Sequence, residues 1–154
     1  MLISQLLQTE LCLCKVEASS KKNLFLTIAN RVGEQVPGMS ADSLYENLLA
    51  REKLGSTGLG GGVAIPHCRM EHLSEPVAAL VTLKRPVDFD ASDNQAVDVL
   101  FVLCVPVQST DEHLQLLAQI SQLLSSAKSR RQLRSARSEA ALCQQAKDLF
   151  VVEA

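Results

Sequence analysis

Apolar residues recur along this chain at two spacings, which predict two kinds of element. Within residues 21–32 they follow one another at four-residue intervals, as Leu24, Ile28 and Val32. This interval marks one face of a helix. The pair Ser19–Ser20 offers an N-cap and Gly33 a stop, so we predict a helix from Lys21 to Val32.

A second helix is predicted after Ser40. Ser40 or Asp42 can cap it, and its apolar face is marked by Leu44, Leu48 and Leu49. Residues 55–62 then hold five of the chain's seven glycines. We therefore predict a loop over 55–62 that runs close to another group.

Continuous apolar and β-branched runs predict strands. Such runs lie at 77–83 and 97–105, and their continuity favours strands buried on both faces. Ser109–Glu112 is expected to cap a following helix, whose apolar positions are Leu114, Leu117, Ile120, Leu123 and Leu124. Two more helices are predicted over roughly 129–136 and 138–150. Helices around a central block of strands make an α/β fold.

Composition narrows the class of protein. With 154 residues, 47% of them hydrophobic and 3% aromatic, the chain suits one domain, residues 1–154, with an aliphatic core. A net charge of -2 argues against a nucleic-acid or anionic-membrane binder. Five cysteines form no even framework, and the longest apolar stretch, 99–107, is too short to span a bilayer. A cytoplasmic protein without membrane insertion is expected.

Candidate chemistry begins at Gly58–Cys68, where a glycine cluster and a short apolar run lead to a proline followed by His67. The run predicts a strand, and His67 is expected at or just past its end, because proline cannot donate to a ladder. The cluster fits neither nucleotide fingerprint, since Gly60 is followed by Gly61 rather than Lys, and Val63 stands where a third glycine is needed. It is either a flexible turn or a place where the backbone approaches a phosphorylated group or a partner protein.

A second histidine, His113, follows another strand and a candidate helix cap. Strand ends and the first turns of following helices gather at one edge of an open α/β sheet. His67 and His113 therefore either face one cleft or are separate structural residues. Cys68 is not expected to act as a nucleophile with His67, because neighbours in extended chain point to opposite sides.

Two other patterns are expected to carry no chemistry. The pairs Cys12–Cys14 and His67–His72 lack the spacing of known metal motifs, so no metal is predicted. Without interleaved aromatics or an overall positive charge, a run of basic positions is expected to be a solvated helix face. These positions are Arg130, Arg131, Arg134 and Arg137.

The segment Ala50–His67 resembles the signature of the type-2 enzyme IIA domains of the bacterial phosphoenolpyruvate-dependent phosphotransferase system, the mannitol/fructose class. The likeness continues through Val97–Phe101 to His113–Leu114 and covers essentially the whole chain. Lys53–Gly58 makes the chain most similar to the nitrogen-related branch of that family. The implied fold is a three-layer α/β sandwich, in which a central mixed sheet of about five strands is flanked by helices on both faces.

This resemblance implies that His67 accepts a phosphoryl group from an HPr-type phosphocarrier protein, itself charged by an enzyme I from phosphoenolpyruvate. It also implies that His113 stabilises the phosphoryl group and that Arg51 gives electrostatic support. Binding contacts are expected from the glycine loop, at Ser56, Thr57, Gly58 and Gly60. No cofactor and no metal are required for this transfer.

The output implied is regulatory, through target proteins, with potassium-transport or sensor-kinase control as family precedents. Two alternatives remain open: a sugar-specific IIA that hands the group to a IIB domain, and a non-catalytic protein-binding module. The chain departs from the family pattern at Gly61, where Asn is common, and at Cys68, where Gly is common. Both departures are expected to affect the loop, and Cys68 is either a candidate oxidation site or an inert thiol.

Overall fold

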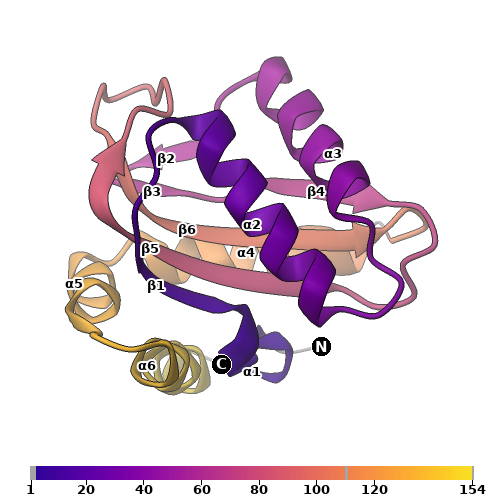
Figure 1. Ribbon diagram of the computed structural model, residues 1–154. Coiled ribbons are helices and arrows are strands. Elements are labelled where there is room, and N and C mark those ends of the chain that lie inside the picture. The colour runs from indigo at the N-terminus through magenta and orange to yellow at the C-terminus, as the bar shows by residue number, and fades with distance from the viewer. Residues whose placement is uncertain (1–2, 110, 154) are drawn as a thin grey trace.

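A mixed β-sheet lies at the centre of the computed structural model, between two layers of helices (Figure 1). The structure describes residues 3–109 and 111–153, and within them six strands form one sheet in the order β1-β5-β6-β3-β2, with β4 also paired to β6. The strands are β1 (Cys12–Val16), β2 (Gly58–Gly60), β3 (Val63–Ala64), β4 (His67–Met70), β5 (Val77–Val87) and β6 (Val97–Pro106). The helices are α1 (Ile3–Leu6), a 3-10 turn η1 (Thr9–Leu11), α2 (Lys21–Gln35), α3 (Ala41–Leu54), α4 (Asp111–Leu124), α5 (Ala127–Ser135) and α6 (Glu139–Glu153).

Strand β6 supplies side chains to both helical layers. Leu100, Val102 and Cys104 pack with α2 and α3, whereas Phe101 and Leu103 pack with α1, α4, α5 and α6. Figure 1 shows α2 and α3 in front of the sheet and α4 behind it. Because side chains alternate along a strand, a continuous apolar run fills two cores at once. The predicted α/β sandwich, with strands buried on both faces, is confirmed.

The short strands β1, β2 and β4 were not predicted from the sequence. Strand β1 lies parallel to β5, and β4 lies parallel to β6. Strand β2 is Gly-Leu-Gly, and β4 is His-Cys-Arg-Met. Neither has the β-branched residues that mark a strand, so both form because a neighbouring strand offers unpaired backbone groups.

The first two helices begin where the sequence predicts, but α2 ends later. The Ser20 side chain accepts a hydrogen bond from the Asn23 amide, and Ser40, rather than Asp42, caps α3. The expectation that Gly33 stops α2 is wrong, because the helix continues to Gln35. At Gly33 an added Cβ would lie 2.9 Å from the Cβ of Ala41. Glycine is therefore needed there for the close approach of α3.

The glycine segment is not a simple loop. Residues 58–60 pair antiparallel with β3, and Gly60, Gly61 and Gly62 turn the hairpin with φ of +91°, +67° and +82°. His67 lies just past the end of β3, as predicted, but it also opens a further strand, β4, which was not predicted. The Pro66 carbonyl accepts a hydrogen bond from the Leu103 amide, so pairing with β6 resumes immediately after the proline.

The C-terminal helices differ slightly from their predicted limits. Helix α5 begins at Ala127 after an Ser126 cap, two residues before the predicted start, and α6 begins at Glu139. Helix α4 begins at Asp111, within the predicted capping segment, while Thr110 of that segment lies outside the described residues. In the described part of the chain, no helix has the length and apolar character needed to cross a membrane.

The contact at Gly33 predicts a destabilising substitution. Gly33→Val should lower the free energy of unfolding by about 1–3 kcal/mol, because its side chain must displace the start of α3. Asn30→Val, at an exposed position of the same helix, is the matched control and should change it by less than about 0.5 kcal/mol. Urea unfolding followed by circular dichroism measures both. Equal midpoints for the two variants would contradict close packing of α2 on α3.

Candidate active site

His67 stands at the start of β4, opposite Leu103 of β6. Its neighbours Cys68 and Met70 are buried in the core beneath α2 and α3. Side chains alternate along a strand, so His67 and Arg69 face the opposite side of the sheet, where α4 lies. The strand pairing therefore aims the His67 ring toward the helix that carries the second histidine.

His113 lies in the first turn of α4, and only 7% of its surface is exposed. The ring centroids of His67 and His113 are 5.6 Å apart, and the ring planes are inclined by 57°. At this distance the two imidazole rings are neighbours in one site. The structure thus brings the two histidines together, as the first of the two sequence-based alternatives requires.

One hydrogen bond fixes the protonation of the His67 ring. The distance from Nδ1 to the carbonyl oxygen of Ile65 is 2.6 Å. A carbonyl oxygen can only accept, so Nδ1 carries the proton and donates it. The lone pair of the neutral ring is then on Nε2. The backbone carbonyl of Ile65, two positions earlier, thus selects which ring nitrogen carries the lone pair.

Burial keeps both imidazoles neutral near pH 7. Burial is the main cause that lowers the pKa of His67, and the positive charge of Arg51 adds to it, while the Ile65 hydrogen bond and Glu52 oppose it. The pKa of His113 is also lowered, first by burial and then by His67 and Arg69. His113 Nδ1 is buried and has no hydrogen-bond partner among the described residues. A buried polar atom of this kind fits a site that receives another polar group.

Arg51 acts on His67 through its charge. Its Nη1 donates to the Gly55 carbonyl at 2.9 Å, which holds the guanidinium at the C-terminal end of α3. The positive charge of Arg51 therefore influences His67, while its guanidinium hydrogen-bonds the loop at Gly55.

The hydroxyls of Ser56 and Thr57 are used within the protein. Ser56 Oγ donates to the Phe89 carbonyl at 2.6 Å. Thr57 is 5% exposed, and its Oγ1 donates to Glu52 Oε2 at 2.8 Å. Both hydroxyls thus bind other parts of the chain, although Ser56 is exposed, and Thr57 is too deeply buried to meet a docking protein directly.

The predicted binding glycines allow close packing of the loop on the chain itself. An added Cβ at Gly58 would lie 2.8 Å from the Cβ of Ala91, and Gly60 needs its positive φ. At Gly61 an added Cβ would lie 3.1 Å from Cζ of Arg130, so glycine lets this arginine of α5 lie close to the turn.

Two residues of the site, Glu52 and Arg69, were missed by the sequence reasoning. Glu52 accepts hydrogen bonds from the Lys21 ammonium and from both the amide and the hydroxyl of Thr57. Arg69 Nη1 donates to the carbonyls of Val107 and Ser109, just before α4. The alternation of His67 and Arg69 along an extended segment was a usable signal for Arg69. No local signal marks Glu52.

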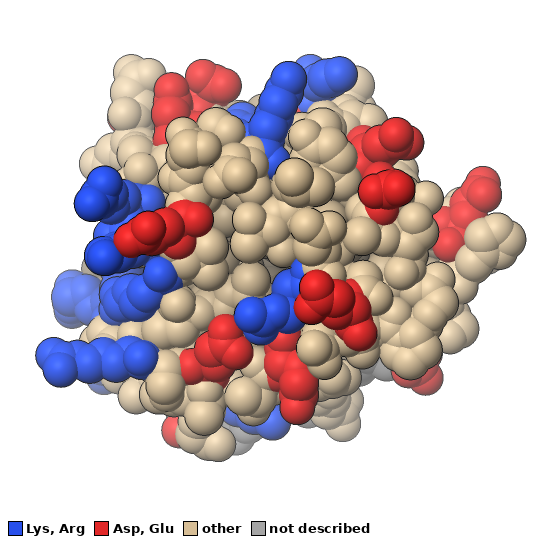
Figure 2. All heavy atoms as spheres, viewed as in Figure 1, with Lys and Arg blue, Asp and Glu red and all other residues tan. Residues whose placement is uncertain are grey.

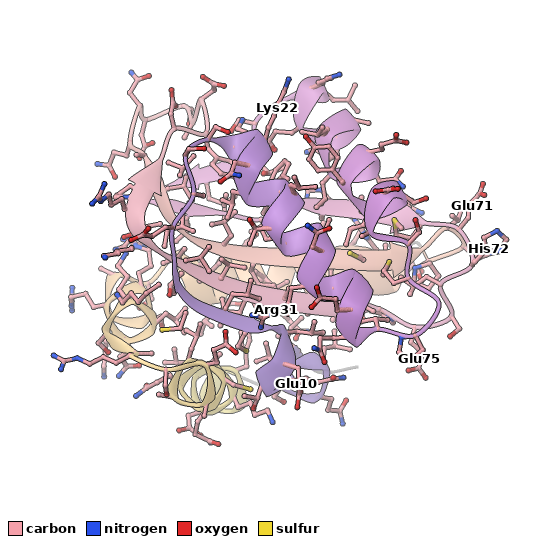
Figure 3. All side chains as sticks on the ribbon, in the orientation of Figure 1. Glu10, Lys22, Arg31, Glu71, His72 and Glu75 are labelled. Carbon is pink, nitrogen blue, oxygen red and sulfur yellow. The ribbon has the colours of Figure 1, made fainter. Side chains whose placement is uncertain are left out.

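The remaining candidate residues do not contribute to the pair of histidines. His72 projects outward at the tip of the β4–β5 loop (Figure 3). No group of metal-ligating side chains occurs in the described residues. Cys68 is 8% exposed and hydrogen-bonds Cys104, which with burial raises the pKa of the Cys104 thiol. Cys68 is therefore an enclosed thiol.

The basic run is only partly a solvated face. Arg134 pairs with Asp98 at 2.8 Å and donates to the Gly61 carbonyl, and Arg130 donates to the Leu124 carbonyl. Arg131 and Arg137 are exposed, as predicted. Lys and Arg side chains gather at the left of Figure 2, on the side of the molecule where α5 lies. The solvated-face prediction is thus wrong for Arg134, which binds the glycine hairpin, and for Arg130, which binds the end of α4.

Comparison with known proteins agrees with this arrangement. The family model described as "Phosphoenolpyruvate-dependent sugar phosphotransferase system, EIIA 2" matches residues 5–148. The nitrogen regulatory protein of Pseudomonas aeruginosa is 49% identical over 142 residues, which cover 92% of each chain. That of Escherichia coli is 38% identical over 143 residues, covering 92% of this chain and 87% of the relative.

Solved structures agree as well. The nitrogen regulatory protein IIA-Ntr of Neisseria meningitidis superposes with a TM-score of 0.87 at 34% identity, covering 96% of this chain and 98% of that chain. The mannitol IIA of Escherichia coli shares the fold, with a TM-score of 0.73 at 17% identity over 90% of this chain and 97% of that one. The chain therefore belongs to the EIIA type-2 family of the phosphoenolpyruvate-dependent sugar phosphotransferase system.

Proposed function

We propose that this protein is a nitrogen-regulatory phosphocarrier that accepts a phosphoryl group on Nε2 of His67 from an HPr-type carrier protein. The observation that carries the proposal is the 2.6 Å hydrogen bond from His67 Nδ1 to the Ile65 carbonyl, in a site shared with His113. It leaves an unprotonated nitrogen available at neutral pH. The nitrogen regulatory names of the whole-length relatives support the branch.

The chemistry follows from that hydrogen bond. The Nε2 lone pair forms the new N–P bond as the bond from phosphorus to the donor protein's nitrogen breaks, and that nitrogen takes back the electron pair. The Nδ1 proton stays on His67, bonded to the Ile65 carbonyl. The ring therefore gains positive charge, which offsets the negative charge of the phosphoryl oxygens. No metal or cofactor is called for by this sequence of events.

Neighbouring side chains meet the remaining electrostatic demand. His113 supplies a ring nitrogen beside His67, and the positive charges of Arg51 and Arg69 act on the two rings. Positioned donors and cations stabilise charge that spreads over the oxygens during phosphoryl transfer. We assign His113 to hydrogen bonding with the phosphoryl group and Arg51 to long-range electrostatic support.

The output we propose is regulatory and cytoplasmic, through proteins that distinguish the phosphorylated from the unphosphorylated form. Potassium transporters and sensor kinases are candidate targets. A sugar-specific IIA that passes the group to a IIB domain is the second candidate. One solved structure with this fold is a mannitol IIA in complex with phosphorylated mannitol IIB, and at 16% identity it supports the fold alone. A purely protein-binding module would need neither the histidine pair nor a fixed tautomer.

Phosphorylation should require His67 and be slowed without His113. With phosphoenolpyruvate, enzyme I and the HPr-type carrier, we expect one phosphoryl group on the wild type by intact mass and none on His67→Ala. His113→Ala should be labelled about a hundredfold more slowly, the usual loss when one stabilising donor is removed. His72→Ala, at the outward-pointing loop position, is the control and should behave as wild type.

Three outcomes would contradict the proposal in different ways. An unlabelled but folded wild type, tested with an active carrier, would favour a binding module. Label that persists in His67→Ala would move the acceptor elsewhere. Rapid transfer from His67 to a sugar-specific IIB domain would favour the sugar-transport alternative.

The lowered pKa values predict how the site responds to pH. Imidazole resonances of His67 and His113, followed by NMR, should titrate with midpoints below 6.5. Phosphorylation should be fastest above pH 6.5 and fall as protonation of His67 removes its lone pair. The unfolded chain binds these protons at higher pH than the folded chain, so both histidines favour the folded state above pH 6.5 and favour it less as pH falls. A midpoint above 6.5 for His67 would contradict the burial argument.

A further inference from the structure

A buried carboxylate near the end of α3 supports the glycine hairpin with a complete set of partners. Of the carboxylates whose side chains the structure describes, only Glu52 is buried, with 5% of its side chain exposed. Its Oε1 lies 3.1 Å from Lys21 Nζ and 3.0 Å from the Thr57 amide, and its Oε2 lies 2.8 Å from Thr57 Oγ1. A buried charge is costly unless it is paired and hydrogen-bonded. These contacts together fix the position of Thr57.

Thr57 in turn fixes the backbone that binds His67. The Thr57 carbonyl accepts a hydrogen bond from the Ile65 amide at 3.0 Å, and the Ile65 carbonyl accepts from His67 Nδ1 at 2.6 Å. The amide and the carbonyl of Ile65 are thus both hydrogen-bonded, the amide to Thr57 and the carbonyl to His67. A movement of Thr57 would shift the Ile65 carbonyl, on which the tautomer of His67 depends.

A second link anchors the same segment. Lys21 Nζ also donates to the Phe89 carbonyl at 3.1 Å, and Ser56 Oγ donates to that same carbonyl at 2.6 Å. The start of α2, the end of α3 and the loop after β5 therefore meet at the base of the hairpin. The carboxylate of Glu52 lies where these elements converge.

From this chain of contacts we propose that Glu52, acting through Thr57 and the Ile65 carbonyl, is a positioning residue that holds His67 in the Nδ1–H tautomer required for phosphoryl transfer at Nε2. The inference rests on the proposed phosphocarrier function and adds a role for two residues that do not touch the phosphoryl group. Glu52 is also negatively charged within electrostatic range of His67. The hydrogen bond from His67 to Ile65, which Glu52 supports through Thr57, and the negative charge of Glu52 itself both favour positive charge on the His67 ring.

Two substitutions weaken these contacts with little change in shape. Thr57→Val deletes the hydroxyl that donates to Glu52, and Glu52→Gln removes the negative charge. Thr57→Ser retains the hydroxyl and should restore wild-type behaviour. Thr82→Val is the matched control, because Thr82 is 1% exposed and lies on β5, where its hydroxyl accepts from the Lys15 amide.

Two measurements test the inference. Long-range proton–nitrogen NMR spectra of the unphosphorylated protein at pH 8 report the tautomer of His67, and intact mass reports the rate of phosphorylation by the HPr-type carrier. We expect Nε2–H signals to appear in Thr57→Val and Glu52→Gln, and phosphorylation to slow by about tenfold or more, the range typical of supporting residues around a reactive group. Thr57→Ser and Thr82→Val should match the wild type in both measurements.

Circular dichroism shows which of the variants Thr57→Val and Glu52→Gln fold. The inference requires at least one folded variant that shows both the changed tautomer and the slower phosphorylation. A slower rate with an unchanged tautomer, or a changed tautomer with an unchanged rate, would overturn the inference. If the wild type is not phosphorylated at all, the proposed function fails, and the NMR spectra still decide whether Glu52 and Thr57 set the tautomer. A wild type that is labelled normally beside unaffected variants would overturn the positioning role alone.

Discussion

The burial of β6 on both faces is the constraint on which the rest of the structure depends. Its side chains enter two separate cores, so helices must cover each face of the sheet. One edge of β6 pairs with β5, and the other is shared by β3 and β4, with only Ile65 and Pro66 between them. His67 is presented where this shared edge resumes pairing. The position of His67 is therefore a consequence of how a short, interrupted strand completes the sheet.

The interruption at Pro66 also explains the chemistry of His67. Ile65 lies outside both strands, so its carbonyl is free to accept the Nδ1 proton rather than a ladder amide. The same residue's amide is bound by Thr57, which is held by a buried carboxylate. A strand break that would weaken an ordinary sheet here supplies the acceptor for the Nδ1 proton and leaves the lone pair on Nε2.

The glycine hairpin is held from two sides. At its base, Glu52 fixes Thr57, and at its turn, Arg134 binds the Gly61 carbonyl while Asp93 accepts from the Gly61 amide at 3.0 Å. Glycine at the turn serves both the positive φ and the approach of the α5 arginines. The glycine cluster, for which the sequence allowed a flexible turn, is thus held in place by hydrogen bonds at its base and at its turn.

The sequence by itself determined the two buried strands, the long helices and their caps, because apolar periodicity and serine capping act over a few neighbouring residues. It also singled out His67, through the glycine cluster and the proline that precede it. Only the tertiary structure decided that Gly33 lies within a helix, that β2 and β4 are strands, and that Glu52 and Arg69 belong to the site. These features depend on contacts between residues far apart in the chain, or on pairing with the unpaired edge of a neighbouring strand, and no local pattern encodes them. The 5.6 Å separation of His67 and His113 is of the same kind, since the residues come from different elements that only the folded sheet brings together.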